Sequence, residues 1–255
     1  MTHELKEISG IECLNDSIFI ALNDGGNGDY VYMLNENFEV LKKITVDNFK
    51  NHDWEDTAID EEYIYIADIG NNNNRRKNLK IGRIKIRDIY NKSVVKAEIM
   101  TVRYESQVEY PPSNKNLNYD AETLISDGEF LYIFSKNRTV PFDGISFIYK
   151  FKFSPNSLLK LTADFEFTPG QSKWIFDSFT GGSYHNGFFY LITYNKLFKL
   201  KLNENGFTLV GSKQFNGLKQ REAICLNSHG KIFIANEFHK WLGNQKVRLM
   251  SWKTN

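Results

Sequence analysis

The sequence has few cysteines and histidines, the residues that stabilise small folds through disulfides or bound metal ions. Only 2 of its 255 residues are cysteines, Cys13 and Cys225, which is too few for a disulfide framework or a thiolate metal cluster. There are only 5 histidines, and no His-x-x-x-His or Cys-x-x-Cys spacing occurs. These absences argue against a structural zinc site.

A surplus of one charge sign and long apolar runs are also absent. The 32 basic and 31 acidic residues give a formal net charge of +1, so the chain lacks the overall basic character of nucleic-acid-binding proteins. No apolar run approaches the ~20 residues that a membrane-spanning helix needs, and the first residues do not resemble a secretory signal. We therefore expect a cytoplasmic monomer without nucleic-acid or membrane partners, or a periplasmic or secreted one if a leader has been trimmed.

What the chain does contain is a repeated β-type pattern. Five short runs, rich in β-branched and aromatic residues, are each preceded by a polar tight-turn signal and by another short strand candidate. A third strand candidate follows in every unit. Aligned by their turns, the first strands of the five units open at equivalent residues, namely Ser9, Glu55, Glu122, Thr180 and Glu222.

The repeat predicts a β-propeller, in which four-stranded sheets are arranged radially. A fourth strand candidate is present in four units, at residues 39–46, 96–104, 158–167 and 207–215. The fifth unit ends after its third strand, and residues 3–8 can supply the missing one. We expect one all-β domain over residues 1–255, a five-bladed β-propeller closed by the N-terminal strand joining the last blade. The alternative is a six-bladed propeller, with an extra blade in the stretch 105–120 or 168–179.

The five opening residues should form a ring of oxygens at one mouth of the central channel. Three of them are carboxylates, which cannot all stay ionised at close range without compensation. A hard cation is one remedy, and Ca²⁺ suits an all-oxygen ring better than Mg²⁺ because it tolerates loose geometry with ~6–8 ligands. We therefore predict a calcium site formed by Ser9, Glu55, Glu122, Thr180 and Glu222. The alternative is a metal-free, water-filled channel whose carboxylates are satisfied by backbone amides and basic groups.

Further polar residues are expected around this mouth, at the ends of the second strands and in the loops that follow them. Asp24 and Asp68 are the candidate general bases, although Asp68 could instead bridge to Arg75 or Arg76. The basic residues suit an anionic ligand, because guanidinium and ammonium groups bind phosphate and carboxylate. The candidate ligand-binding residues are Arg75, Arg76, Lys136, Asn137, Arg138, Tyr194 and Glu237.

Three motifs resemble those of a bacterial β-propeller family. The segment 53–56 reads Asp-Trp-Glu-Asp, residues 65–72 contain Asp-Ile-Gly-Asn-Asn, and residues 120–124 read Asp-Ala-Glu-Thr-Leu. The family carries Trp-Glu-Asp, Asp-Ile-Gly-x-Asn and Asp-Ala-Glu-Ala-Leu signatures, and Thr123 departs from the last of these. The resemblance covers most of the chain and implies a propeller fold, but no particular activity.

A looser similarity is to the calcium-activated nucleotidases (apyrases) and, more distantly, to phytase-like propellers. The order Ser, Glu, Glu, Thr, Glu around the predicted ring is similar to that of the apyrase calcium site, and this implies a central calcium ion. One hypothesis is therefore a calcium-centred propeller that binds a small anionic ligand, with hydrolysis of a phosphoester or ester as its enzymatic version. The other is a metal-free scaffold that binds a protein partner on the face with the long loops.

Overall fold

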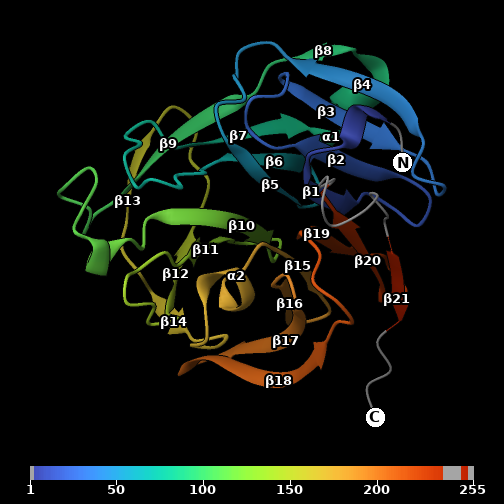
Figure 1. The fold of residues 1–255 in the computed structure, drawn as a ribbon. Helices are drawn as coiled ribbons and strands as arrows, with labels where there is room; N and C mark the ends of the chain where they lie inside the picture. The colour runs from blue at the N-terminus through green and yellow to red at the C-terminus, as the bar shows by residue number, and fades with distance from the viewer. Residues whose placement is uncertain (1–2, 238–247, 252–255) are drawn as a thin grey trace.

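The computed structural model describes residues 3–237 and 248–251, which consist mostly of β-strands with a few short helices. The strands form five sheets, called A to E here (Figure 1). Sheet A contains β1 (Ile8–Cys13), β2 (Phe19–Asn23), β3 (Tyr30–Leu34), β4 (Val40–Val46) and β8 (Val94–Val95). Sheet B contains β5 (Trp54–Ile59), β6 (Tyr63–Asp68), β7 (Lys80–Lys85), β9 (Glu98–Tyr104) and β13 (Leu158–Leu161).

The other three sheets follow in chain order. Sheet C contains β10 (Asp120–Ser126), β11 (Leu131–Lys136), β12 (Ser146–Phe151) and β14 (Phe165–Phe167). Sheet D contains β15 (Gly181–His185), β16 (Phe188–Ile192), β17 (Lys196–Asn203) and β18 (Gly206–Gln214). Sheet E contains β19 (Arg221–Leu226), β20 (Lys231–Asn236) and β21 (Arg248–Ser251). The helices are η1 (His3–Leu5), α1 (Ile86–Asn91), η2 (Asn114–Asn116) and α2 (Trp174–Asp177).

The first strand of each sheet lies nearest the centre of the molecule, where these strands form a closed ring. β1 contacts β5, β5 contacts β10, β10 contacts β15, β15 contacts β19, and β19 contacts β1 again. The sheets are therefore arranged around an axis, as in Figure 1. This is the β-propeller arrangement that the repeated pattern predicts.

The hairpins between first and second strands are fixed by turn residues that recur along the chain. In sheet B, Asp60 Oδ1 accepts hydrogen bonds from the amides of Glu62 and Tyr63 at 2.8 and 2.7 Å. In sheet C, Asp127 Oδ1 accepts from the next two equivalent amides in the same way. Because such side chains hold their own backbone in a turn, the polar turn signals of the sequence fall where the strands reverse.

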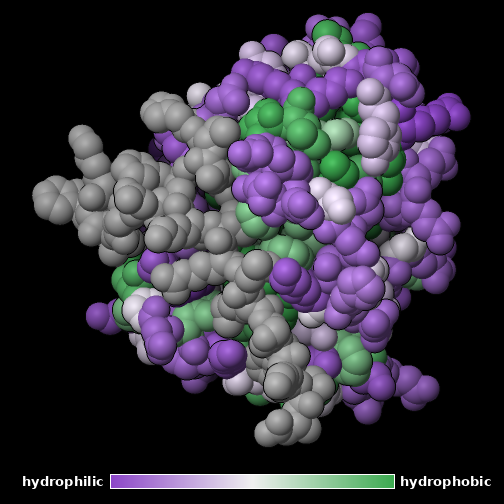
Figure 2. All heavy atoms as spheres, turned by 90° about the vertical axis from the view of Figure 1, so that its right-hand side faces the viewer, coloured by the Kyte–Doolittle hydropathy of each residue, from purple (hydrophilic) through white to green (hydrophobic). Residues whose placement is uncertain are grey.

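Apolar side chains fill the spaces between neighbouring sheets. Between sheets A and B, Trp54 is fully buried, and its ring stacks on Phe49 with 5.6 Å between centroids. Rings of sheets C and D, including Phe134 and Phe189, meet in edge or tilted geometry. Figure 2 shows that hydrophilic residues make up most of the coloured surface on the side of β20 and β21. None of the helices in the described part of the chain is long and apolar enough to cross a membrane.

The predicted closure by an N-terminal strand is wrong for the described residues. Residues 3–5 form the η1 turn, and β1 already begins at Ile8 and pairs with β2. The backbone carbonyls of Glu4 and Glu7 accept hydrogen bonds from Asn23 Nδ2 and from the Asp24 amide, so this segment lies against the end of β2. Leu5 is fully buried in the cluster between sheets A and E, so this segment packs at the junction of the two sheets without adding a strand to sheet E.

The long connections hold no additional sheet. Within residues 105–119, only η2 is regular, and within 168–179 only α2 is, so neither stretch contributes a strand. The predicted strand at 158–167 is split between two sheets, because β13 pairs in parallel with β9 and β14 pairs with β12. β8 likewise pairs in parallel with β4. In each parallel pair, a short strand from the chain segment that forms the next sheet adds to the outer edge of the preceding sheet.

Candidate functional site

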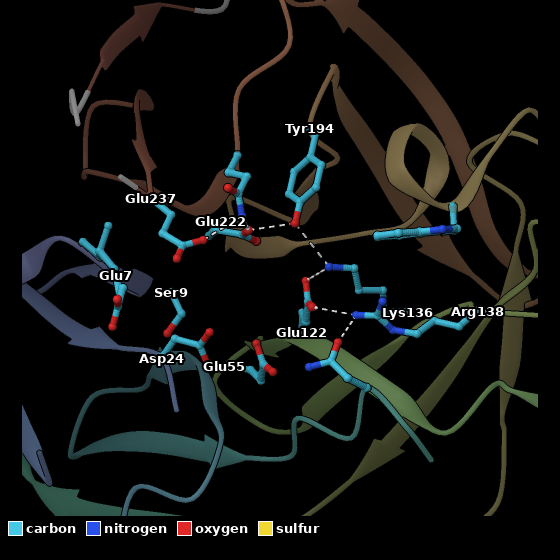
Figure 3. Close-up of a pocket in the computed structure, with 14 residues that line it drawn as sticks. Glu7, Ser9, Asp24, Glu55, Glu122, Lys136, Arg138, Tyr194, Glu222 and Glu237 are labelled. Atoms are coloured by element: carbon cyan, nitrogen blue, oxygen red, sulfur yellow. Dashed lines mark hydrogen bonds and ion pairs between the residues drawn. The ribbon is translucent and has the colours of Figure 1, made fainter. Parts of the chain in front are cut away.

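Four of the five predicted ring residues project into one cavity because each sits at a β-bulge. The pairing register shifts between Ile8 and Gly10 in β1, and at the equivalent places in β5, β10 and β19. A bulge leaves one residue without a ladder partner and re-aims its side chain. The residues at these bulges are Ser9, Glu55, Glu122 and Glu222, and all four line a cavity of about 330 Å³ at the channel mouth (Figure 3).

Thr180 does not join this group. It directly precedes β15, whose pairing with β16 runs from Gly181 without a register shift. Its Oγ1 donates a hydrogen bond to the backbone oxygen of Arg221 at 2.5 Å, and the residue is not part of the cavity lining. The ring of five oxygens expected from the sequence is therefore a set of four, because the regular strand keeps the Thr180 hydroxyl on the neighbouring backbone.

The structure brings several of the other predicted residues to the same cavity. Asp24, Lys136, Tyr194 and Glu237 all line it, as does Arg138. In Figure 3, Asp24, Glu55, Glu7 and Glu237 lie on one side of the cavity, and Lys136 and Arg138 lie on the other. The cavity therefore has an acidic side and a basic side.

The remaining predicted residues lie outside the cavity lining. The Asp68 side chain is fully buried, with Arg76 Nη2 2.9 Å from its Oδ1, which also accepts a hydrogen bond from the Asp53 amide. Asp68 thus bridges to Arg76, which is the structural role that the sequence offers as its alternative, and it does not line the cavity. Asn137 bonds within its own loop, to Thr139 and the Ile145 carbonyl. Arg75 is exposed and is not among the residues that line the cavity.

The basic side of the cavity is built from buried ion pairs. Lys136, with a side chain only 2% exposed, contacts Glu122 Oε2 directly. Arg138 lies 3.5 Å from the other oxygen of Glu122 and pairs through Nε with Asp120 Oδ2 at 2.5 Å. Burial opposes the charge on Lys136, but Glu122 and Glu222 outweigh it and raise the lysine pKa. Lys136 is therefore a cation, and Glu122 is its counter-ion.

The acidic side contains a compact group of three carboxylates. Asp24, Asp53 and Glu55 each place one carboxylate oxygen within 4.8 Å of the others. Two glycines make room for them: a Cβ at Gly25 would lie 2.5 Å from Asp53 Oδ1, and one at Gly70 would overlap the Glu55 carboxylate. Glu55 is 6% exposed, and no hydrogen bond to its carboxylate is found in the described part of the chain.

The carboxylates of this corner are held in an unfavourable environment. Burial, with repulsion from neighbouring carboxylates, raises the pKa of Asp24 to about 7 and that of Asp53 to about 6, although Arg76 opposes the rise at Asp53. The same two causes raise the pKa of Glu55 well above its usual range and that of Glu222 to about 8. A site with several raised carboxyl pKa values favours either bound protons or a bound cation.

Some residues of the cavity have no signal in the sequence. Glu7 and Gln220 line the cavity from the segments just before β1 and β19, outside the strands whose pattern the sequence shows. Trp174 is the first residue of the short helix α2, and its indole ring faces Arg138 with 5.0 Å between guanidinium carbon and ring centroid. All three positions depend on how loops are placed around the cavity, which no local pattern predicts.

No protein-family model and no curated protein matches this sequence. Among solved structures, the PQQ-bound aldose sugar dehydrogenase from Streptomyces coelicolor is 9% identical and matches 96% of this chain and 94% of its own, with a TM-score of 0.50. The WD40 repeats of RRP9 (9% identity, TM-score 0.46) match 92% of this chain. A nidogen/laminin complex (12% identity, TM-score 0.48) matches 91% of this chain and 72% of its own. This chain spans 63% of the RRP9 chain.

These likenesses concern the fold. At identities this low, the match to the dehydrogenase shows that the chain has a β-propeller fold, and it carries no information about ligand or activity. The site must therefore be argued from its own residues.

Proposed function

We propose that this protein is a ligand-binding propeller whose channel mouth binds a divalent cation on Asp24, Asp53 and Glu55. The observation that carries the proposal is the position of the Glu55 carboxylate, which lines the cavity, has no hydrogen-bond donor among the described residues and lies within 4.8 Å of two further carboxylates. Burial and repulsion from neighbouring carboxylates raise its pKa. A bound cation would offset both effects.

Calcium is the ion that fits these donors best. All three side chains offer oxygen, and they come from a loop and from the start of a strand, so the arrangement does not impose a strict octahedron. Calcium accepts ~6–8 oxygens and leaves positions for water or for a ligand. The other carboxylates that line the cavity, Glu222 and Glu237, are not direct ligands in this proposal, and the Ser9 hydroxyl donates a hydrogen bond to the Trp54 carbonyl.

The second part of the proposal is that the bound ion prepares the cavity for a small anionic ligand. Lys136 and Arg138 are already offset by Glu122 and Asp120, so without a cation the carboxylates of the acidic side are left to face an incoming anion. Those that are ionised repel it. With the cation in place, its carboxylate or phosphate would lie between the ion and the basic side, within reach of the Tyr194 hydroxyl.

We also infer that sheets A to E are the five blades of one propeller. The closed sequence of contacts among β1, β5, β10, β15 and β19 supports this count, as does the repeated position of the bulges.

The test is calorimetric titration of the chelator-stripped protein with CaCl₂ and with MgCl₂. We expect one Ca²⁺ per chain with tighter binding than Mg²⁺, loss of binding in Glu55→Gln, and unchanged binding in Glu109→Gln, which changes an exposed glutamate. A carboxylate and a phosphate ester should then bind only after Ca²⁺ has been added. The proposal would be overturned if Ca²⁺ gave no heat of binding and if neither Ca²⁺ nor chelator changed the melting temperature. That result would favour the metal-free scaffold.

A further inference from the structure

The only two cysteines of the chain meet at the junction between the first and the last sheet. Cys13 lies in β1 of sheet A, and Cys225 lies in β19 of sheet E. Both are free and buried, they belong to the same apolar cluster on contacting strands, and the Cys13 thiol is near enough to Cys225 to raise its pKa. Two residues 212 positions apart are thus side by side, and no other cysteine exists to compete for either.

This junction is where the two ends of the ring come together. Residues 3–8 do not add a strand to sheet E. In the described residues, sheets A and E are held together by side-chain packing around Leu5, Ile8 and Phe233 and by hydrogen bonds from Ser228 to Asp16. Every other pair of neighbouring sheets is joined by a chain connection that runs directly from one to the next. A covalent bond between β1 and β19 would supply the missing connection.

We propose that Cys13 and Cys225 form a disulfide when the protein meets a peroxide, and that this bond locks the ring between its first and last sheets. The thiolate of Cys13 attacks one oxygen of hydrogen peroxide, which gives a sulfenic acid on Cys13 and releases hydroxide. The Cys225 sulfur then attacks the Cys13 sulfur and displaces water. Overall, two thiols and one peroxide give one disulfide and two waters, so the cysteines lose two electrons and peroxide gains them.

The order of the two steps follows from the surroundings of the cysteines. Cys13 is 9% exposed and lies at the end of β1, whereas Cys225 is fully buried. Burial, the neighbouring Cys13 thiol and the nearby Glu12 raise the pKa of Cys225 well above its usual range, so it is the poorer first nucleophile. The reaction should be slow in the native protein and should prefer a small oxidant.

The bond would also act on the cavity described above. Ser9 precedes Cys13 by four residues on β1, and Glu222 precedes Cys225 by three on β19, so the strands that carry the two cysteines also line the cavity. A link between them fixes the spacing of that part of the cavity wall. Formation of the disulfide does not depend on metal binding, because it needs only the two thiols and the peroxide.

The test uses the full chain, reduced and then treated with hydrogen peroxide, with one sample in buffer and one in about 2 M urea to loosen the junction. Alkylation in denaturant followed by peptide mapping should show a Cys13–Cys225 cross-link within single chains and a mass loss of about 2 Da. Because the closed loop is long, the oxidised protein should melt about 5–10 °C higher than the reduced one, and dithiothreitol should reverse the shift.

Cys13→Ser and Cys225→Ser serve as matched controls, with Cys13→Ala as a second variant if the serine disturbs packing. Each should prevent both the cross-link and the shift in melting temperature. The inference would be overturned by over-oxidised Cys13 without a cross-link in both samples, by disulfides between chains only, or by a cross-linked protein that melts at the temperature of the reduced one.

Discussion

Gly70 lies directly against the carboxylate of Glu55. Because glycine has no Cβ, there is space at this position for the side chains of both Glu55 and Asp53. Its φ is not in the left-handed region, so an alanine there meets no backbone strain. Gly70→Ala should therefore fold but displace two proposed ligands. We expect Ca²⁺ affinity to fall at least about tenfold, or ~1.4 kcal/mol. Calorimetric titration measures this, and unchanged affinity would place the ion elsewhere.

Glu55→Gln should have opposite effects on the metal-free and the metal-bound protein. Removing one buried charge relieves repulsion with Asp24 and the cost of burial, so the metal-free variant should melt at a higher temperature than the wild type, by about 2–4 °C per kcal/mol relieved. The same variant should lose the rise in melting temperature that Ca²⁺ gives. A metal-free variant that melts lower would show that Glu55 is stabilised by contacts other than a cation. Glu109→Gln is the control, because its side chain is exposed.

Much of the fold and part of the site could be predicted because the determining signals are local. Turn residues such as Asp60 and Asp127 bond to amides two and three residues ahead, so their effect is contained in a short stretch of sequence. Counting from those turns placed Ser9, Glu55 and Glu222 at equivalent positions, and they do line one cavity. The absence of a bulge in β15 has no local signature, so the inward direction expected for Thr180 was wrong.

The parts that could not be predicted depend on contacts between distant segments. Apolar residues at 5 and 8 fit a strand as well as they fit a turn packed between two sheets, and only the position of β2 decides between these. The corner at Asp24 and Glu55 likewise joins two sheets through glycines whose role is the space they leave. The sequence alone therefore predicts an acidic mouth, but it could not divide that mouth into an acidic side and a side built from the buried ion pairs of Lys136 and Arg138.

Calcium binding should strengthen as the pH rises from about 5.5 to 7.5. The pKa of Asp53 is about 6 and that of Asp24 about 7, so protons compete with the ion below these values. A carboxyl pKa raised in the folded state also means that folding retains protons there, so the stability of the metal-free protein falls as the pH rises from about 4 to 7. Added Ca²⁺ should restore it. Titrations at several pH values test both signs, and an affinity independent of pH would exclude these carboxylates as ligands.

The buried pair of Lys136 and Glu122 should be far more costly to break than an exposed pair of the same type. Lys136→Met removes the cation and leaves Glu122 buried without its counter-ion, which should cost about 3–5 kcal/mol of unfolding free energy. The matched control is Lys152→Met, which breaks an exposed pair with Glu129 and should cost at most about 1 kcal/mol. Urea denaturation measures both.

A double variant separates the charge from the packing of the lysine chain. Adding Glu122→Gln to Lys136→Met removes the orphaned charge, so the double variant should recover a large part of the loss, because a neutral pair avoids the desolvation cost. If the double variant is as unstable as Lys136→Met alone, the lysine acts through its aliphatic stem, and the ion pair does not determine the stability of this side of the cavity. If the unfolding free energy recovers, the ion pair of Lys136 and Glu122 determines the stability of the basic side. An anionic ligand would then have to bind there without separating that pair.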